Sequence, residues 1–140
     1  DEEVGKKEIR TMPLGSETLL IVDDDAAIRR VINDTLEPLG YNLLEAGSGE
    51  DALALLNRTK EKIDLVLTDL IMPGINGQEL IETLQKERPE IKFILMSGYT
   101  DDIVAGRGVF EQGVEFINKP LLPMSLTNKI REVLDAKQVE

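Results

Sequence analysis

Five short strand-like segments alternate with stretches that carry apolar residues at helical spacing, and this alternation constrains the fold more than any other feature. The segments lie at residues 18–22, 41–46, 65–68, 93–96 and 115–118. Short continuous apolar runs, such as the first, are typical of strands buried on both faces of a parallel sheet. The sequence therefore predicts an α/β domain with a doubly wound, five-stranded parallel sheet and helices on both faces.

The expected helices are marked at their ends. Apolar residues at helical spacing continue to Leu39, and we expect Gly40 to cap the first helix. Ser48 is followed three positions later by a carboxylate residue, which is typical of a helix start. The third helix should stop near Pro89, and Pro123 suits the first turn of the last helix.

The two ends of the chain and one internal stretch lack such signals. We expect residues 1–17 to be a charged linker or tail, residues 18–136 to form the domain and residues 137–140 to be a C-terminal tail. Residues 101–113 contain closely spaced glycines, each of which costs a helix interior about 1 kcal/mol relative to alanine. We expect at most a short helix there, followed by a loop.

Composition excludes several kinds of chemistry. The chain has 16 basic and 27 acidic residues, and its net charge of −11 disfavours binding to nucleic acid or anionic lipid. It has no cysteine and no histidine, which excludes a thiolate site, a Ser-His-Asp triad and a phosphohistidine on this chain. No apolar run reaches the roughly 18 residues of a membrane span, so we expect no membrane insertion. Acid–base or metal chemistry must use carboxylates, lysine, tyrosine and hydroxyls.

Four of the expected strands end at residues that can carry chemistry. The first ends at Asp23 and Asp24, the third at Asp69, the fourth at Ser97 and the fifth at Lys119. The carboxyl ends of parallel strands share one edge of the sheet, where ligands bind. Three carboxylates at one edge repel one another, and a hard divalent cation such as Mg²⁺ would compensate them.

These residue types together suit phosphoryl transfer. Lys119 supplies a positive charge for a phosphoryl group, and Ser97 supplies a donor to one of its oxygens. Asp69 is then a plausible nucleophile, because a carboxylate that attacks phosphorus forms an aspartyl phosphate. Such a reaction needs positioning and charge neutralisation, which a metal and a lysine provide.

Four motifs occur in order at these strand ends. They are Leu-Ile-Val-Asp-Asp-Asp at 20–25, Asp-Leu-Ile-Met-Pro-Gly at 69–74, Met-Ser-Gly at 96–98 and Asn-Lys-Pro at 118–120. In this combination the chain resembles the receiver domain of two-component response regulators. The resemblance covers roughly residues 18–136 and implies a flavodoxin-like fold with strand order 2-1-3-4-5.

The resemblance also implies roles for individual residues. Asp69 corresponds to the phosphoacceptor, Asp24 to a direct Mg²⁺ ligand and Asp23 to a ligand through water. The backbone carbonyl of Ile71 would complete the protein's share of the metal shell. The domain would accept a phosphoryl group from a phosphohistidine and would not itself be an enzyme.

Further residues correspond to the family's switch. Ser97 and Lys119 would bind the phosphoryl oxygens, and Phe116 stands at the switch-aromatic position. Phosphorylation would then reshape the face made by the fourth and fifth strands and the helices that follow them. The family often has a cis peptide bond before the residue that matches Pro120.

The second half of the chain is most similar to receivers at the C-terminus of hybrid sensor histidine kinases. The resemblance rests on Met-Ser-Gly-Tyr-Thr-Asp-Asp at 96–102 and Gly-Val-Phe-Glu-Gln-Gly at 108–113. It implies a sensor histidine kinase or an upstream kinase core as phosphodonor, with a histidine phosphotransfer protein as a further candidate partner. We expect a cytoplasmic domain, tethered to the membrane if its parent is a membrane sensor kinase. Whether it stands alone or is a fragment of a hybrid kinase stays open, as does homodimer formation.

Two site-flanking residues, Ile71 and Tyr99, are bulky in this chain. The resemblance implies that these positions influence hydrolysis of the acyl phosphate. Our hypothesis is that both side chains restrict the attacking water and lengthen the phosphorylated lifetime.

Simpler interpretations stand beside these. Asp25 is expected to cap a helix, Phe116 is as plausible in the core as in a switch, and Leu122 leaves the last helix without a side-chain cap. Met72, Met96 and Met124 are expected to fill the core. For the whole domain the alternative is an interaction module that works without phosphorylation. A phosphatase that uses an aspartate nucleophile would need a second aspartate at position 71, where this chain has isoleucine.

Overall fold

The computed structural model describes residues 12–98 and 114–136 of the chain. Five parallel strands form one sheet in the order β2-β1-β3-β4-β5. This confirms the predicted doubly wound fold and its strand order. The strands are β1 (Thr18–Val22), β2 (Asn42–Ala46), β3 (Leu65–Asp69), β4 (Lys92–Ser97) and β5 (Val114–Asn118). The described helices are α2 (Ala26–Leu36), the 3₁₀ helix η1 (Glu37–Leu39), α3 (Gly49–Arg58), α4 (Gly77–Glu87) and α6 (Pro123–Asp135).

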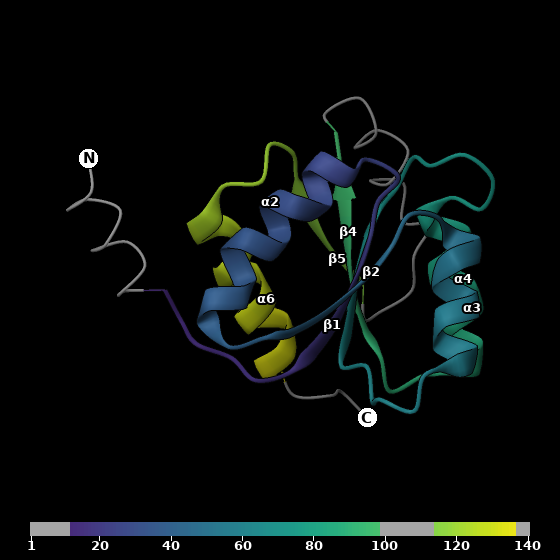
Figure 1. Ribbon diagram of the computed structural model, residues 1–140, viewed down its shortest axis with the longest axis horizontal. Helices are drawn as coiled ribbons and strands as arrows, with labels where there is room; N and C mark the ends of the chain where they lie inside the picture. The colour runs from purple at the N-terminus through teal and green to yellow at the C-terminus, as the bar shows by residue number, and fades with distance from the viewer. Residues whose placement is uncertain (1–11, 99–113, 137–140) are drawn as a thin grey trace.

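The helices cover both faces of the sheet, with α2 and α6 on one side and α3 and α4 on the other (Figure 1). Successive residues of β1 point to opposite faces of the sheet. Leu19 and Ile21 pack toward α2 and α6. Leu20 and Val22 pack toward α3 and α4. All four side chains are completely buried. Burying a side chain of this size stabilises the fold by about 1.5–3 kcal/mol, so the two clusters on either side of the sheet fix its position between the helices.

The first helix is shorter than the sequence pattern predicts. We expected helical residues up to Leu39, but α2 ends at Leu36 and a 3₁₀ turn follows. Pro38 is the reason, because proline has no N–H for the α-helical ladder and its ring clashes with the preceding turn. Gly40 then closes the 3₁₀ turn with a φ of 108°, a left-handed conformation that favours glycine.

Side chains cap most of the described helices. The Asp25 and Ser48 side chains accept the predicted backbone N–H bonds at the starts of α2 and α3. Asn76 forms a reciprocal capping box with Glu79 at the start of α4, a cap that we did not predict. Leu122 gives α6 no side-chain cap, as predicted.

Met12 and Glu17, which precede β1, contact the rest of the domain. The Met12 side chain is 7% exposed and belongs to the apolar cluster under α2 and α6. Both carboxylate oxygens of Glu17 accept hydrogen bonds from the Arg131 guanidinium of α6, at 2.8 and 3.0 Å. These hydrogen bonds hold the segment before β1 against the last helix. The expected domain start at residue 18 stays a prediction.

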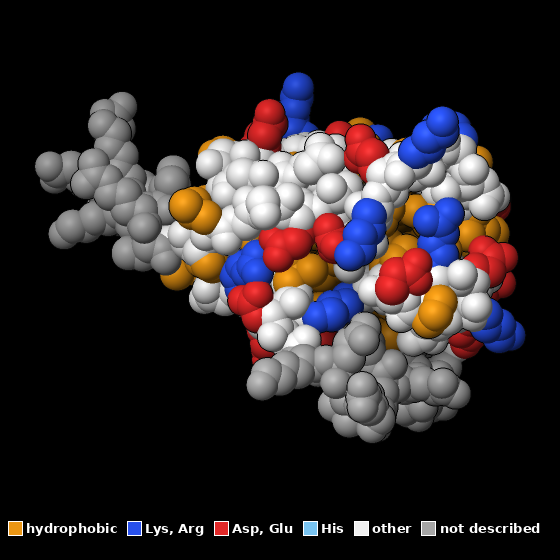
Figure 2. All heavy atoms as spheres, turned by 90° about the horizontal axis from the view of Figure 1, so that it is seen from below, with side chains coloured by type: hydrophobic (Ala, Val, Ile, Leu, Met, Phe, Trp, Pro, Cys, Tyr) orange, Lys and Arg blue, Asp and Glu red, His pale blue; other side chains and the backbone are white. Residues whose placement is uncertain are grey.

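The predictions for residues 1–11, 99–113 and 137–140, including the short helix within 101–113, lie outside the described residues. Among the residues that are described, no helix is long and apolar enough to cross a membrane. On the face shown in Figure 2, acidic and basic side chains are interspersed, and apolar patches lie between them.

Candidate functional site

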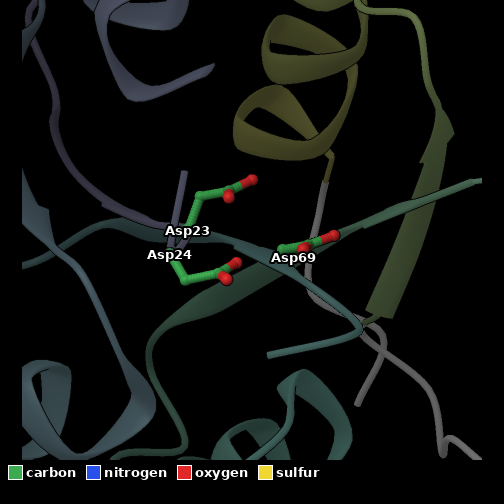
Figure 3. A group of neighbouring side chains, drawn as sticks. All are labelled: Asp23, Asp24 and Asp69. Carbon is green, nitrogen blue, oxygen red and sulfur yellow. The ribbon is translucent and has the colours of Figure 1, made fainter. Parts of the chain in front are cut away.

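Three carboxylates meet at the carboxyl edge of the sheet. Asp23 and Asp24 follow the last residue of β1, and Asp69 ends β3, the neighbouring strand. One oxygen from each carboxylate lies within 4.8 Å of the others, and Figure 3 shows the three side chains side by side. The parallel register of β1 and β3 brings together residues that are 46 positions apart in the sequence.

Two of these carboxylates are buried and one is exposed. Asp23 is 1% exposed and Asp69 is 6% exposed, whereas Asp24 faces solvent. The Asp23 oxygen Oδ1 accepts the Asp25 backbone N–H at 2.8 Å, while Oδ2 is buried without a hydrogen-bond partner. A buried carboxylate oxygen in this state is costly, and a divalent cation would satisfy it. The donor set therefore fits a hard, oxygen-seeking ion such as Mg²⁺.

Lys119 brings a positive charge to the cluster from the end of β5. Its Nζ lies 2.9 Å from Asp69 Oδ1 and 3.6 Å from Asp23 Oδ2, the second distance being an ion pair too long for a hydrogen bond. One ammonium thus contacts both buried carboxylates. The cluster still has an excess of negative charge, since three carboxylates face one lysine.

The electrostatics of the cluster shift the pKa values of its members. Burial raises the pKa of Asp23 and of Asp69, and the nearby Lys119 charge offsets this only in part. Burial lowers the pKa of Lys119, but the hydrogen bond to Asp69 and the charges of both aspartates outweigh it, so the pKa is raised overall. Ionising Asp23 and Asp69 therefore costs more in the folded site than in water when no further cation is present.

Ser97, Phe116 and Pro120 lie on or next to β4 and β5. Ser97 is fully buried at the end of β4, and its hydroxyl is 3.5 Å from the Asn118 side-chain oxygen. Phe116 is partly buried on β5 and packs against the cluster of apolar residues next to α3 and α4. The Lys119–Pro120 peptide bond is cis, as the resemblance implied.

Of the two flanking residues, Ile71 is within the described part of the chain. Ile71, two residues after Asp69, is 59% exposed beside the site. Tyr99 lies outside the described residues. Of the predicted core methionines, Met72 and Met96 are buried and Met124 is partly buried.

Sequence reasoning missed two features that shape the site. Gly77, at the start of α4, donates its N–H to the Leu70 carbonyl, and a Cβ at this position would lie 2.2 Å from the Asp69 carbonyl oxygen. Only glycine allows α4 to approach the end of β3 so closely. Arg29, in the second turn of α2, donates from its guanidinium to the Asp23 carbonyl. A basic residue near a helix N-terminus is electrostatically unfavourable and was the one available signal.

The chain matches a family. Residues 19–131 match the model of the response regulator receiver domain. The chain belongs to this family. The predicted resemblance is thereby confirmed, and the receiver domain is a signalling domain of two-component systems.

Relatives of this receiver domain include both kinases and transcriptional regulators. The sensor kinase CckA of Brucella abortus (strain 2308) is 35% identical over 121 residues, which cover 86% of this chain and 13% of CckA. The transcriptional regulatory protein GlrR of Escherichia coli (strain K12) is 36% identical over 120 residues, covering 84% of this chain and 26% of GlrR. This chain therefore spans only a minor part of either relative.

Solved receiver structures share the fold. The receiver domain of the hybrid histidine kinase CckA matches with a TM-score of 0.71 at 30% identity, covering 84% of this chain and 98% of that structure. A CheY-like receiver domain protein from Methanospirillum hungatei JF-1 matches with a TM-score of 0.74 at 35% identity, covering 86% and 95%. These matches agree with the strand order found in this receiver domain.

Proposed function

We propose that this receiver domain is a Mg²⁺-dependent phosphoacceptor in which Asp69 is phosphorylated. The observation that carries the proposal is the convergence of Asp69 with Asp23, Asp24 and Lys119 at one edge of the sheet. A bound Mg²⁺ would neutralise charge on the phosphoryl oxygens and on the carboxylates. Asp23, Asp24, Asp69 and the backbone carbonyl of Ile71 would hold the ion.

The protein's own groups suit the transfer step. An Asp69 carboxylate oxygen attacks the phosphorus of a phosphohistidine, an O–P bond forms, and the P–N bond to the histidine breaks. The histidine nitrogen keeps the electron pair of that bond and takes up a proton. Lys119, already 2.9 Å from Asp69 Oδ1, is within reach of the developing negative charge on the phosphoryl oxygens.

We further propose that the acyl phosphate acts as a switch through Ser97 and Phe116. A phosphoryl group on Asp69 would accept a hydrogen bond from the Ser97 hydroxyl and draw the end of β4 toward it. Phe116 lies on β5, opposite Leu95 of β4, so a shift of β4 would allow its ring to move. The result would be a two-state change of the surface formed by β4, β5 and their following segments.

A phosphohistidine donor would lie outside this chain, since the chain has no histidine. The similarity to the sensor kinase CckA supports a sensor histidine kinase, or a kinase core in the same parent protein, in that role. A histidine phosphotransfer protein is a further candidate partner. The site of action would be the cytoplasm, where kinase cores use ATP.

The test is the intact mass of the domain after incubation with MgCl₂ and acetyl phosphate, a small phosphodonor. We expect a gain of one phosphoryl group in the wild type and in Asp25→Asn, a matched loss of one nearby charge. We expect no gain in Asp69→Asn, or in the wild type with EDTA. A phosphorylated Asp69→Asn variant, or a wild type that binds Mg²⁺ but is not phosphorylated by any donor, would refute the proposal and favour a phosphorylation-independent interaction module.

A further inference from the structure

The guanidinium of Arg29 contacts the end of β1, which carries part of the acidic cluster, and the neighbouring strand β2. The side chain extends from α2 and is 19% exposed. Its Nη1 donates to the backbone carbonyl of Asp23 at the end of β1, and its Nε donates to Glu45 Oε1 on β2 at 3.1 Å. The guanidinium therefore connects the helix to the loop that carries two of the three carboxylates.

Glu45 is itself held in place. The Asn33 side-chain amide, one turn further along α2, donates to the second carboxylate oxygen of Glu45. One carboxylate thus accepts from both α2 residues. This arrangement restricts the long Arg29 side chain and directs it at the Asp23 carbonyl, because a guanidinium presents its donors in a fixed planar fork.

Apart from Oδ2, the remaining hydrogen-bonding groups of Asp23 also have partners. Its N–H donates to the Ala46 carbonyl at 3.2 Å, and its Oδ1 accepts the Asp25 N–H at 2.8 Å. The Asp23 carbonyl shares a planar peptide unit with the N–H of Asp24. Holding that carbonyl therefore fixes the direction in which Asp24 leaves the strand, although the Asp24 side chain itself is exposed.

We propose that Arg29 is a positioning residue for the metal site: by holding the Asp23–Asp24 peptide, it keeps the Asp24 carboxylate on the cluster with Asp23 and Asp69. The inference rests on the proposed Mg²⁺ site and deepens it. Residues that orient metal ligands from outside the ligand shell commonly change metal affinity by about 10- to 100-fold when they are replaced.

The direction in which Mg²⁺ affinity changes when Arg29 is replaced distinguishes a positioning role from a direct effect of the Arg29 charge. Arg29 is a cation beside an acidic cluster, so its charge alone opposes Mg²⁺ binding, and its removal should tighten binding. If Arg29 positions Asp24, its removal should weaken binding instead. The two explanations therefore predict opposite changes in the same dissociation constant.

The experiment measures Mg²⁺ dissociation constants by isothermal titration calorimetry on the full chain. Arg29→Met removes the charge and the donors but keeps most of the aliphatic stem. Arg30→Met is the matched control, because Arg30 is the next residue on α2, exposed, and carries the same charge. We expect Arg29→Met to bind Mg²⁺ about tenfold more weakly than Arg30→Met. Arg29→Lys should be intermediate, since it restores a charge and one donor but not the fork.

The outcomes are separable. Equal or tighter binding by Arg29→Met than by Arg30→Met overturns the inference and leaves the proposed function intact. A wild type that binds no Mg²⁺ overturns both. Unfolding in EDTA shows whether Arg29→Met is folded; if it is not, Arg29→Lys decides, and wild-type affinity in that variant overturns the inference.

Discussion

Replacing Asp23 by asparagine should stabilise the receiver domain when no Mg²⁺ is present. Oxygens of Asp23, Asp24 and Asp69 lie within 4.8 Å of one another, and two unit charges at that separation repel by about 3.5 kcal/mol at an effective dielectric constant of 20. Asp23→Asn removes two such repulsions, about 7 kcal/mol. It also removes the attraction to Lys119 at 3.6 Å, about 4.6 kcal/mol by the same relation.

The difference between these energies is a stabilisation of about 2 kcal/mol. The variant also no longer buries a charged oxygen that lacks a hydrogen-bond partner, which stabilises it further. Asparagine keeps an oxygen that can accept the Asp25 N–H, so that hydrogen bond need not be lost. The variant should at the same time lose most of its stabilisation by Mg²⁺, because a ligand that binds only the folded state stabilises it according to its affinity.

The assay is urea unfolding at neutral pH, first in EDTA and then in excess MgCl₂. Asp25→Asn is the matched control, since it removes one nearby charge while asparagine caps helices about as well as aspartate. In EDTA we expect Asp23→Asn to exceed both the wild type and this control in free energy of unfolding. A variant that is less stable than the wild type in EDTA would refute the reasoning from repulsion and burial.

Three further predictions concern the pH dependence of stability, the cap of α4 and the lifetime of the acyl phosphate. Burial raises the pKa of Asp23 and Asp69, so these groups bind more protons in the folded than in the unfolded state. The metal-free domain should therefore become more stable as the pH falls from neutral through the raised pKa values toward the ordinary carboxyl range. Mg²⁺ affinity should fall over the same range, and calorimetry that shows an affinity independent of pH would contradict this. Asn76→Ala should cost about 1 kcal/mol in urea unfolding through loss of the α4 capping box, whereas Asn76→Ser should remain near wild type. Ile71→Asn should shorten the lifetime of phosphorylated Asp69, as should Tyr99→Glu, when intact mass is followed after removal of the phosphodonor; unchanged lifetimes in both would reject the hypothesis that bulky flanking residues restrict water.

Much of the site was predictable because strand ends are local features. The apolar run of β1 stops at Asp23, and that of β3 stops at Asp69. Parallel strands must place their carboxyl ends at one edge, so the two residues could be assigned to one site before any distance was known. Lys119 follows from the same rule at the end of β5.

Local rules were less successful where two signals competed. Apolar spacing favoured a first helix that continued to Leu39, and Pro38 ended the α-helical part at Leu36 instead. No cap was predicted for α4, although Asn76 and Glu79 three residues later form a capping box, a pattern visible in the sequence.

The order of the elements and the residues that end each strand were predictable, because both depend on hydrophobic periodicity and on residues close together in the chain. Three contacts are visible only in the folded chain: Lys119 lies 2.9 Å from Asp69, Met12 packs into the core and Arg29 holds the Asp23 carbonyl. These contacts depend on strand register and helix placement, which many weak packing interactions set together. The raised pKa values of Asp23 and Asp69 follow from the burial of these carboxylates against residues distant in the chain.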